Sequence, residues 1–229
     1  MNAITRLLFA TVVIAMFAQT PAVAVTITFR QGFAGYTQGQ DNWLYKQQPN
    51  TNFGTNPGLG IGKLGLPDEQ HALIGFYGIF GNGVGQIPFG TTITSATLGL
   101  LNTGVTVPAN GEIHQMFIPW TDTVDTWNSL NGGLNNVPAG EFDPTPSYSG
   151  SFGSGPFPVT PIVQAWSNGV PNYGFALIPT ASGEIVVGTN ESGLNLHPIL
   201  TINYVAIPEP ATVTLAILAG WVIVGMRRR

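Results

Sequence analysis

Short runs of alternating apolar and polar residues recur along the chain, separated by turns rich in glycine, proline and asparagine. In residues 93–101, for example, Ala96, Leu98 and Leu100 face one way, and Ser, Thr and Gly lie between them. A period of two residues is typical of a β-strand with one buried face. The pattern predicts nine strands, at residues 25–30, 42–45, 59–63, 72–77, 93–101, 112–118, 173–178, 184–187 and 199–204. An all-β sandwich or barrel is therefore expected.

One stretch, residues 160–166, has apolar residues at helical spacing. Thr160 is the predicted N-cap, and Pro161 suits the first helical position because its missing N–H needs no partner there. Residues 128–158 are rich in Gly, Pro and Ser and are predicted to form one long loop.

Residues 1–24 have the order of a secretory signal peptide. Arg6 precedes a short apolar run, and Ala22-Val23-Ala24 forms a small-residue cleavage site. Cleavage after Ala24 would leave Val25 as the mature N-terminus. An uncleaved N-terminal anchor is the alternative, although the apolar run is short for one.

The tail, residues 208–229, begins with Pro208-Glu209-Pro210, continues as an uncharged apolar run and ends with Arg227-Arg228-Arg229. As a helix this run spans roughly 24 Å, against about 30 Å of hydrocarbon. It therefore predicts a marginal membrane anchor with its arginines on the cytoplasmic side. An ordinary tail anchor is one interpretation.

The order of parts also resembles the PEP-CTERM sorting signal of Gram-negative bacteria. The resemblance implies an exosortase-type processing enzyme as partner and transient anchoring in the inner membrane. Cleavage near the Pro-Glu-Pro box then releases such proteins to the cell surface or to an exopolysaccharide matrix.

Residues 25–207 between these ends suit one domain with its own core. Three basic residues, Arg30, Lys46 and Lys63, stand against ten acidic ones. Because this balance disfavours a phosphate backbone, no nucleic-acid partner is expected. The chain has no cysteine, so its stability must come from the core or from bound ions.

A series of motifs runs in order through this domain: Gln40-Asp41-Asn42-Trp43-Leu44, Asn52-Phe53-Gly54, His71-Ala72-Leu73-Ile74-Gly75-Phe76, Ile93-Thr94-Ser95-Ala96-Thr97-Leu98-Gly99-Leu100, Trp120, Val124-Asp125-Thr126-Trp127-Asn128, Val159-Thr160, Trp166, Asn172-Tyr173-Gly174-Phe175, Glu191 and His197-Pro198-Ile199-Leu200-Thr201. The series resembles the DNRLRE domain, an extracellular bacterial module of surface proteins and polysaccharide-degrading enzymes. This resemblance implies a jelly-roll β-sandwich of the carbohydrate-binding-module type, with alginate-binding relatives. Many relatives carry basic residues at the position of Gly75 and near Leu44, so binding of an acidic sugar does not carry over to this chain.

Few residues suggest catalysis. Asp122 and Asp125 could form an acid/base pair, but hydrogen bonding within a turn is the favoured interpretation. Glu112 and His114 share a strand face, which favours a solvated face over a metal or acid/base site. The glycines of residues 81–85 lack the lysine and helix of a phosphate loop and predict a flexible turn. The protein is predicted not to be an enzyme.

Calcium is the one candidate cofactor, because extracellular β-sandwiches often hold a structural ion between carboxylate and carbonyl oxygens. The candidate ligands Asp41, Asp68, Glu69 and Glu191 lie near predicted strand ends. Solvated acids are the alternative interpretation.

Sugar binding needs exposed aromatic rings that stack on pyranose faces. The candidate residues are Trp43, Tyr45, Trp120 and Trp127, and for the last two the favoured interpretation is packing in the core or anchoring of a loop. Two functions thus stand side by side: a non-catalytic module that binds extracellular polysaccharide, and a purely structural surface or biofilm matrix protein without specific sugar binding.

Overall fold

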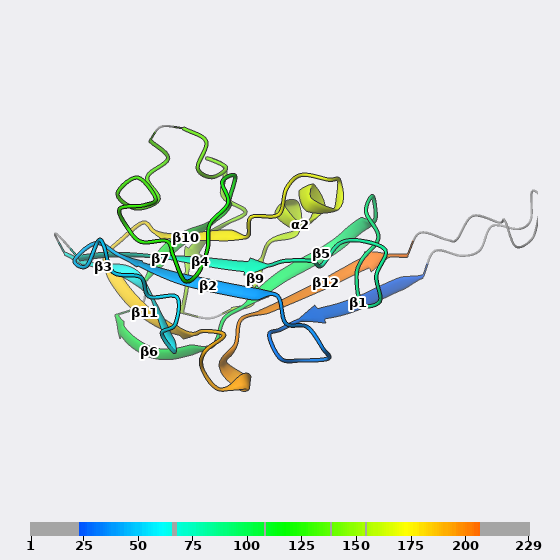
Figure 1. Ribbon diagram of the computed structural model, residues 1–229, viewed down its shortest axis with the longest axis horizontal. Coiled ribbons are helices and arrows are strands. Elements are labelled where there is room, and N and C mark those ends of the chain that lie inside the picture. The colour runs from blue at the N-terminus through cyan, green and yellow to red at the C-terminus, as the bar shows by residue number, and fades with distance from the viewer. Residues whose placement is uncertain (1–22, 66–67, 108, 138, 154, 207–229) are drawn as a thin grey trace, which may run out of the picture. The chain divides into compact units, whose positions relative to one another are not determined.

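Antiparallel β-strands dominate the computed structural model (Figure 1), which describes residues 23–206 except 66–67, 108, 138 and 154. The segment Val25–Val205 forms one compact unit. Sheet A has the order β1 (Ala24–Phe29), β12 (Ile199–Val205), β5 (Thr92–Gly99) and β9 (Phe157–Pro158). Sheet B has the order β6 (Asn102–Val107), β11 (Gly183–Gly188), β3 (Gly58–Gly65), β4 (Asp68–Phe76), β10 (Phe175–Pro179), β7 (Asn110–Gln115) and β8 (Tyr148–Ser151), with β2 (Gly39–Tyr45) also paired to β4. The predicted all-β, sandwich-like fold is confirmed.

Strand β4 is the branch point of sheet B. Strand β2 pairs with it from Gln70 to Phe76 along one edge. The other edge pairs first with β3, at Asp68–Gln70, and then with β10, at Ala72–Ile74. The sheet therefore forks beyond β4, and β2 is left as an edge strand with one neighbour.

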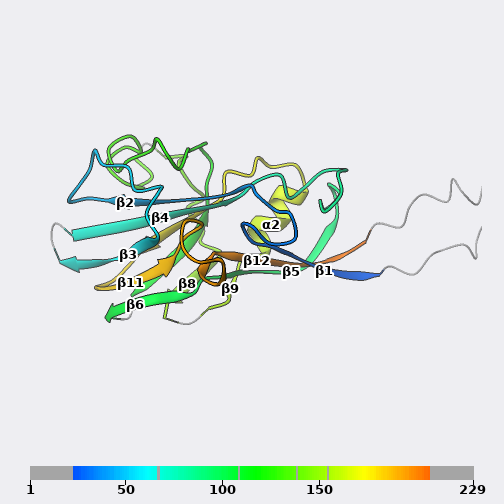
Figure 2. The same cartoon turned by 60° about the horizontal axis from the view of Figure 1, so that its bottom comes forward.

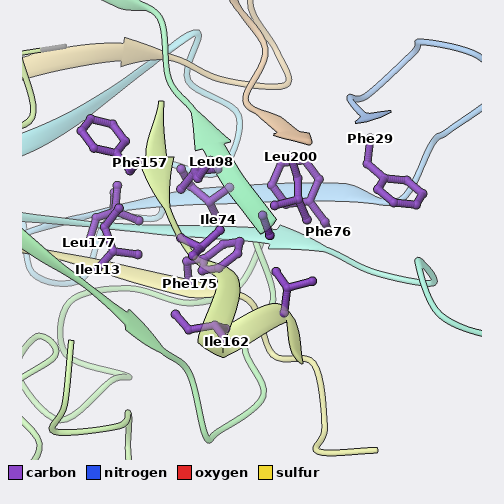
Figure 3. Close-up of a cluster of buried hydrophobic side chains, with 14 of the residues drawn as sticks. Phe29, Ile74, Phe76, Leu98, Ile113, Phe157, Ile162, Phe175, Leu177 and Leu200 are labelled. Carbon is purple, nitrogen blue, oxygen red and sulfur yellow. The ribbon is translucent and has the colours of Figure 1, made fainter. Parts of the chain in front are cut away.

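The main core lies between the two sheets. Sheet A contributes Phe29, Leu98 and Leu200, and β4 contributes Ile74 and Phe76 (Figure 3). All are buried, as the alternation of apolar and polar residues predicts. The helix α2 (Thr160–Ser167) adds Ile162, Val163 and Trp166 to this core.

A second core covers the opposite face of sheet B. Leu73, which alternates with Ile74 on β4, points into it together with Leu44 of β2. The long connection between β7 and β8 lies over this face and contributes Trp120, Trp127 and further apolar side chains (Figures 1 and 2). Because both faces are covered, β4 is buried along most of its length.

All nine predicted strands have a counterpart, but three others in the described residues were not predicted. They are β6, β8 and β9, and the last two lie within residues 128–158, so the prediction of one long loop there is wrong. The predicted cap Thr160 is also wrong. Val159 is the N-cap and makes no side-chain cap bond. The hydroxyl of Thr160 instead accepts a bond from the backbone N–H of Ala96 at 2.9 Å, which joins α2 to β5.

The predicted signal peptide and sorting signal lie outside the described residues, apart from the last residues before the cleavage site. The Pro208-Glu209-Pro210 box and Arg227-Arg228-Arg229 belong to that outer part. Among the described residues, none of the helices is long and apolar enough to cross a bilayer.

Candidate functional site: an aromatic platform at the end of β2

Three aromatic rings gather where β2 ends. Trp43 and Tyr45 occupy alternate positions of β2 and therefore share a face. Their rings are stacked, with centroids 5.1 Å apart and planes 18° apart. Phe53, from the turn that follows, lies 4.7 Å from Trp43 and 6.2 Å from Tyr45. All three are half-buried, so together they form a surface cluster that we call the aromatic platform.

Trp43 is the inner ring of the platform. It packs against the main core, and its Nε1 is buried without a hydrogen-bond partner in the described part of the chain. A Cβ on Gly60 of β3 would come within 3.0 Å of Trp43 Nε1 and Cε2, so the indole lies directly over the glycine backbone. Tyr45, unlike Trp43, is not among the side chains that pack against either hydrophobic core.

Polar groups surround Tyr45. Gln70 of β4 is its partner in the strand register, and Gln70 Nε2 donates to Glu184 Oε1 at 2.8 Å and to Asp68 Oδ1 at 3.2 Å. Burial raises the pKa of the Tyr45 phenol, and the nearby charges of Asp68 and Glu184 raise it further. The phenol thus stays a neutral donor beside two carboxylate acceptors, a combination that suits the hydroxyl groups of a sugar.

A network of charges lies next to the platform. Glu69 accepts from Lys63 at 2.8 Å and from Lys46 at 3.0 Å, and its Oε1 lies 3.3 Å from Nε2 of the buried His71. The hydrogen bond from His71 lowers the pKa of Glu69 most, followed by those from Lys63 and Lys46. Two of the three basic residues of the domain are therefore paired with one carboxylate.

Trp120 and Trp127, predicted as sugar-stacking residues, lie in the second core. They are only 6% and 5% exposed. Trp120 Nε1 donates to the backbone oxygen of Tyr173 at 2.7 Å, and the Trp127 ring packs beside His71 and under the ammonium group of Lys46. Since neither ring offers a face to solvent, core packing is the interpretation that this structure favours for both.

The four predicted calcium ligands divide into two distant pairs. Asp68 and Glu69 begin β4, whereas Asp41 lies near the other end of β2, close to Glu191. Glu69 is already occupied by Lys46 and Lys63. Within the described residues, no group of three or more potential metal-binding side chains comes together. The structure therefore does not assemble the predicted calcium site.

The side chains of Asp125 and His114, which were considered for catalysis, make contacts within the protein itself. Asp125 accepts from Thr121 N and from the Ser129 hydroxyl, both at 2.7 Å, as expected for a turn. His114 is only 3% exposed, so the predicted solvated strand face is wrong. Its Nδ1 lies 2.7 Å from the Asp143 carbonyl oxygen and its Nε2 lies 3.2 Å from Glu112 Oε2.

Sequence reasoning missed Gln70 and Glu184 as parts of the site. Gln70 lies two residues before the predicted strand start Ala72 and therefore shares its face, which is the signal that could have identified it. Glu184 carried no such signal, because its position depends on the pairing of β11 with β3. No protein-family model matches this chain, and no curated protein sequence matches it either.

Proposed function

We propose that the Val25–Val205 unit is a non-catalytic module that binds a neutral polysaccharide at the aromatic platform. The observation that carries this proposal is the position of Tyr45, which stacks on Trp43 with one face and lies among Gln70, Asp68 and Glu184. An aromatic ring binds the apolar face of a sugar, and neighbouring carboxylates accept its hydroxyl hydrogens. For the connection of the strands between the two sheets, we propose the topology of a jelly roll.

The charges around the platform favour a neutral ligand over a polyuronate. Asp68 and Glu184 act electrostatically on Tyr45, and the ammonium groups of Lys46 and Lys63 are paired with Glu69. The carboxylate of an acidic sugar would therefore lie close to the carboxylates of Asp68 and Glu184. The nearby lysines, which are paired with Glu69, would not neutralise it. Repulsion should weaken its binding, and more so at low salt, where the screening length grows.

Export is the second part of the proposal, and it rests on the two ends of the sequence. The signal peptide would direct the chain across the inner membrane, and the tail would anchor it there transiently. An exosortase-type enzyme would then release it to the cell surface or the extracellular matrix of a Gram-negative bacterium. A polysaccharide-binding domain would retain the released protein in such a matrix.

A glycan array probed with the wild-type protein and with Tyr45→Ala tests the binding proposal. Wild type should bind a neutral glycan with little dependence on salt, and Tyr45→Ala should bind it more weakly while keeping its thermal midpoint. Phe117→Ala is the matched control, since Phe117 is an aromatic residue that is 41% exposed outside the platform. If no glycan binds, the purely structural alternative gains support. Tight, salt-sensitive binding of alginate would contradict the charge argument.

A further inference from the structure

A groove with a volume of about 410 Å³ lies at the other end of β2 from the platform. One wall is residues 33–38, which join β1 to β2, and the other comes from the loop that joins β4 to β5, at residues 78 and 83–86. Residues 27–29 of β1 also line it. The volume is within the range of pockets that hold small ligands, roughly 300–1,000 Å³.

Both walls are held in place by the protein itself. The Tyr36 hydroxyl donates to the carbonyl oxygen of Tyr77 at 3.1 Å, and the Tyr36 ring meets Phe29 edge-on at 5.3 Å. In the opposite wall, Gln86 Nε2 donates to the Gly78 carbonyl oxygen, and Gln86 Oε1 accepts from the Gly83 N–H, both at 2.8 Å. The glycine-rich residues 81–85, predicted to be a flexible turn, are thus held in place by the Gln86 side chain.

The lining of the groove contains no charged side chain, although the domain as a whole is acidic. Hydroxyl and amide groups come from Thr28, Thr37, Gln38 and Gln86, and an aromatic rim comes from Phe33, which is 43% exposed. Uncharged donors and acceptors beside an aromatic ring match a ligand that carries many hydroxyl groups and no charge.

We propose that this groove is a second glycan site, separate from the aromatic platform, that takes a neutral saccharide unit. A fatty or aliphatic ligand would cover the exposed amide of Gln38 without giving it a hydrogen-bond partner. An acidic sugar would find only the guanidinium of Arg30, which lies over the Phe33 ring at 4.9 Å, outside the lining. The choice of a saccharide as ligand rests on the proposed function. Binding in the groove should not depend on Tyr45, however, because the two sites lie roughly 20 Å apart along β2.

Titration calorimetry on the purified full chain tests this proposal. The probes are the neutral oligosaccharides cellohexaose, xylohexaose and mannohexaose, with a hexagalacturonate as the acidic probe. The groove variant combines Phe33→Ala with Gln38→Ala, two exposed positions whose loss should leave the thermal midpoint unchanged. It is compared with Tyr45→Ala, with all three substitutions together, and with Phe117→Ala as an aromatic control outside both sites.

A neutral hexasaccharide should still bind the Tyr45→Ala protein, and adding the groove substitutions should weaken that binding about tenfold or more. Binding by the groove variant that equals wild type for every neutral probe overturns the groove proposal and leaves the platform standing. Loss of binding in the groove variant, with Tyr45→Ala unaffected, supports the groove and refutes the platform. A groove variant that weakens only hexagalacturonate refutes the neutral ligand class, and a wild type that binds no probe refutes both sites.

Discussion

The carboxyl group of Asp41 accepts a hydrogen bond from the backbone N–H of Asn190 at 2.8 Å, which ties β2 to the segment between β11 and β12. Asp41 is 3% exposed, and burial raises its pKa from 3.8 to about 8, with the charges of Glu191 and Asp122 adding to the effect. A single N–H does not replace the hydration that a carboxylate loses. The fold therefore prefers Asp41 in its neutral form.

This preference predicts a specific pH dependence of stability. Below pH 3.8, Asp41 is protonated in the folded and the unfolded chain and carries no penalty. Between pH 3.8 and about 8 only the unfolded chain ionises, so the contribution of Asp41 to the free energy of unfolding falls as pH rises. Asp41→Asn keeps the acceptor for Asn190 and removes the titration.

The thermal midpoint of Asp41→Asn should exceed that of wild type by a margin that grows from pH 5 to pH 8, reaching ~4 °C or more. Titrating groups that do not act on Asp41, such as Glu69 and His71, contribute equally to both proteins and cancel in the difference. Parallel midpoint curves for the two proteins over this range would show that Asp41 is ionised in the fold.

Trp43 and Tyr45 should respond differently to truncation, although they stack on each other. Trp43→Ala removes a ring that packs against the main core and over Gly60, so it should cost about 2–3 kcal/mol of unfolding free energy. Tyr45→Ala should cost under about 1 kcal/mol, because the phenol faces outward. Urea unfolding of both variants measures the two values. Equal losses would mean that Tyr45 is as much a core residue as Trp43.

Gly54 should tolerate no side chain. A Cβ there would overlap the carbonyl oxygen of Asp122, which also accepts from Asn52 Nδ2 at 2.6 Å. Gly54→Ala should therefore destabilise the fold by ~2 kcal/mol or more, measured by thermal unfolding. Gly193→Ala is the matched control, since its φ is −65° and a Cβ there meets nothing within 4 Å. A Gly54→Ala protein as stable as this control would rule out the tight contact.

Replacement of Glu209 tests the export proposal in the producing bacterium. Because Glu209 lies in the box that precedes the marginal anchor, Glu209→Ala should leave the chain uncleaved and retained in the membrane fraction. Immunoblots of membrane and medium fractions, with Glu191→Ala as a control outside the tail, measure the partition. Normal release of Glu209→Ala into the medium would remove the sorting claim.

The strands with strict alternation could be predicted from the sequence. When one face of a strand is buried, apolar and polar residues alternate along it, and this alternation is visible residue by residue. Residues 93–101 are the clearest case, with Ala96 and Leu98 buried as expected. Strands β8 and β9 were not, since Tyr148–Ser151 and Phe157–Pro158 are too short to show a period and are strands only because β7 and β5 pair with them. Tertiary pairing, rather than local sequence, creates such elements.

The site was predictable only where its residues lie on one strand. Trp43 and Tyr45 follow from alternation along β2, whereas the partners Gln70 and Glu184 reach the platform through the registers of β4 and β11. For Trp120 and Trp127, the sequence favoured packing in the core or anchoring of a loop over sugar stacking. Their loop folds back over sheet B and buries both rings.

The position of β12 between β1 and β5 has a consequence for how the domain folds. Thr26 of β1 bonds to Asn203 of β12 across 177 residues of chain, and β5 also pairs with β12. Sheet A therefore cannot close until nearly the whole domain has been synthesised, and such non-local pairing makes folding slow, on the order of milliseconds to seconds. A nascent chain that ends before Ile199 leaves β1 and β5 with open edges. Under the export that we propose, folding that waits for the last strand would leave the chain unfolded while a secretion channel threads it.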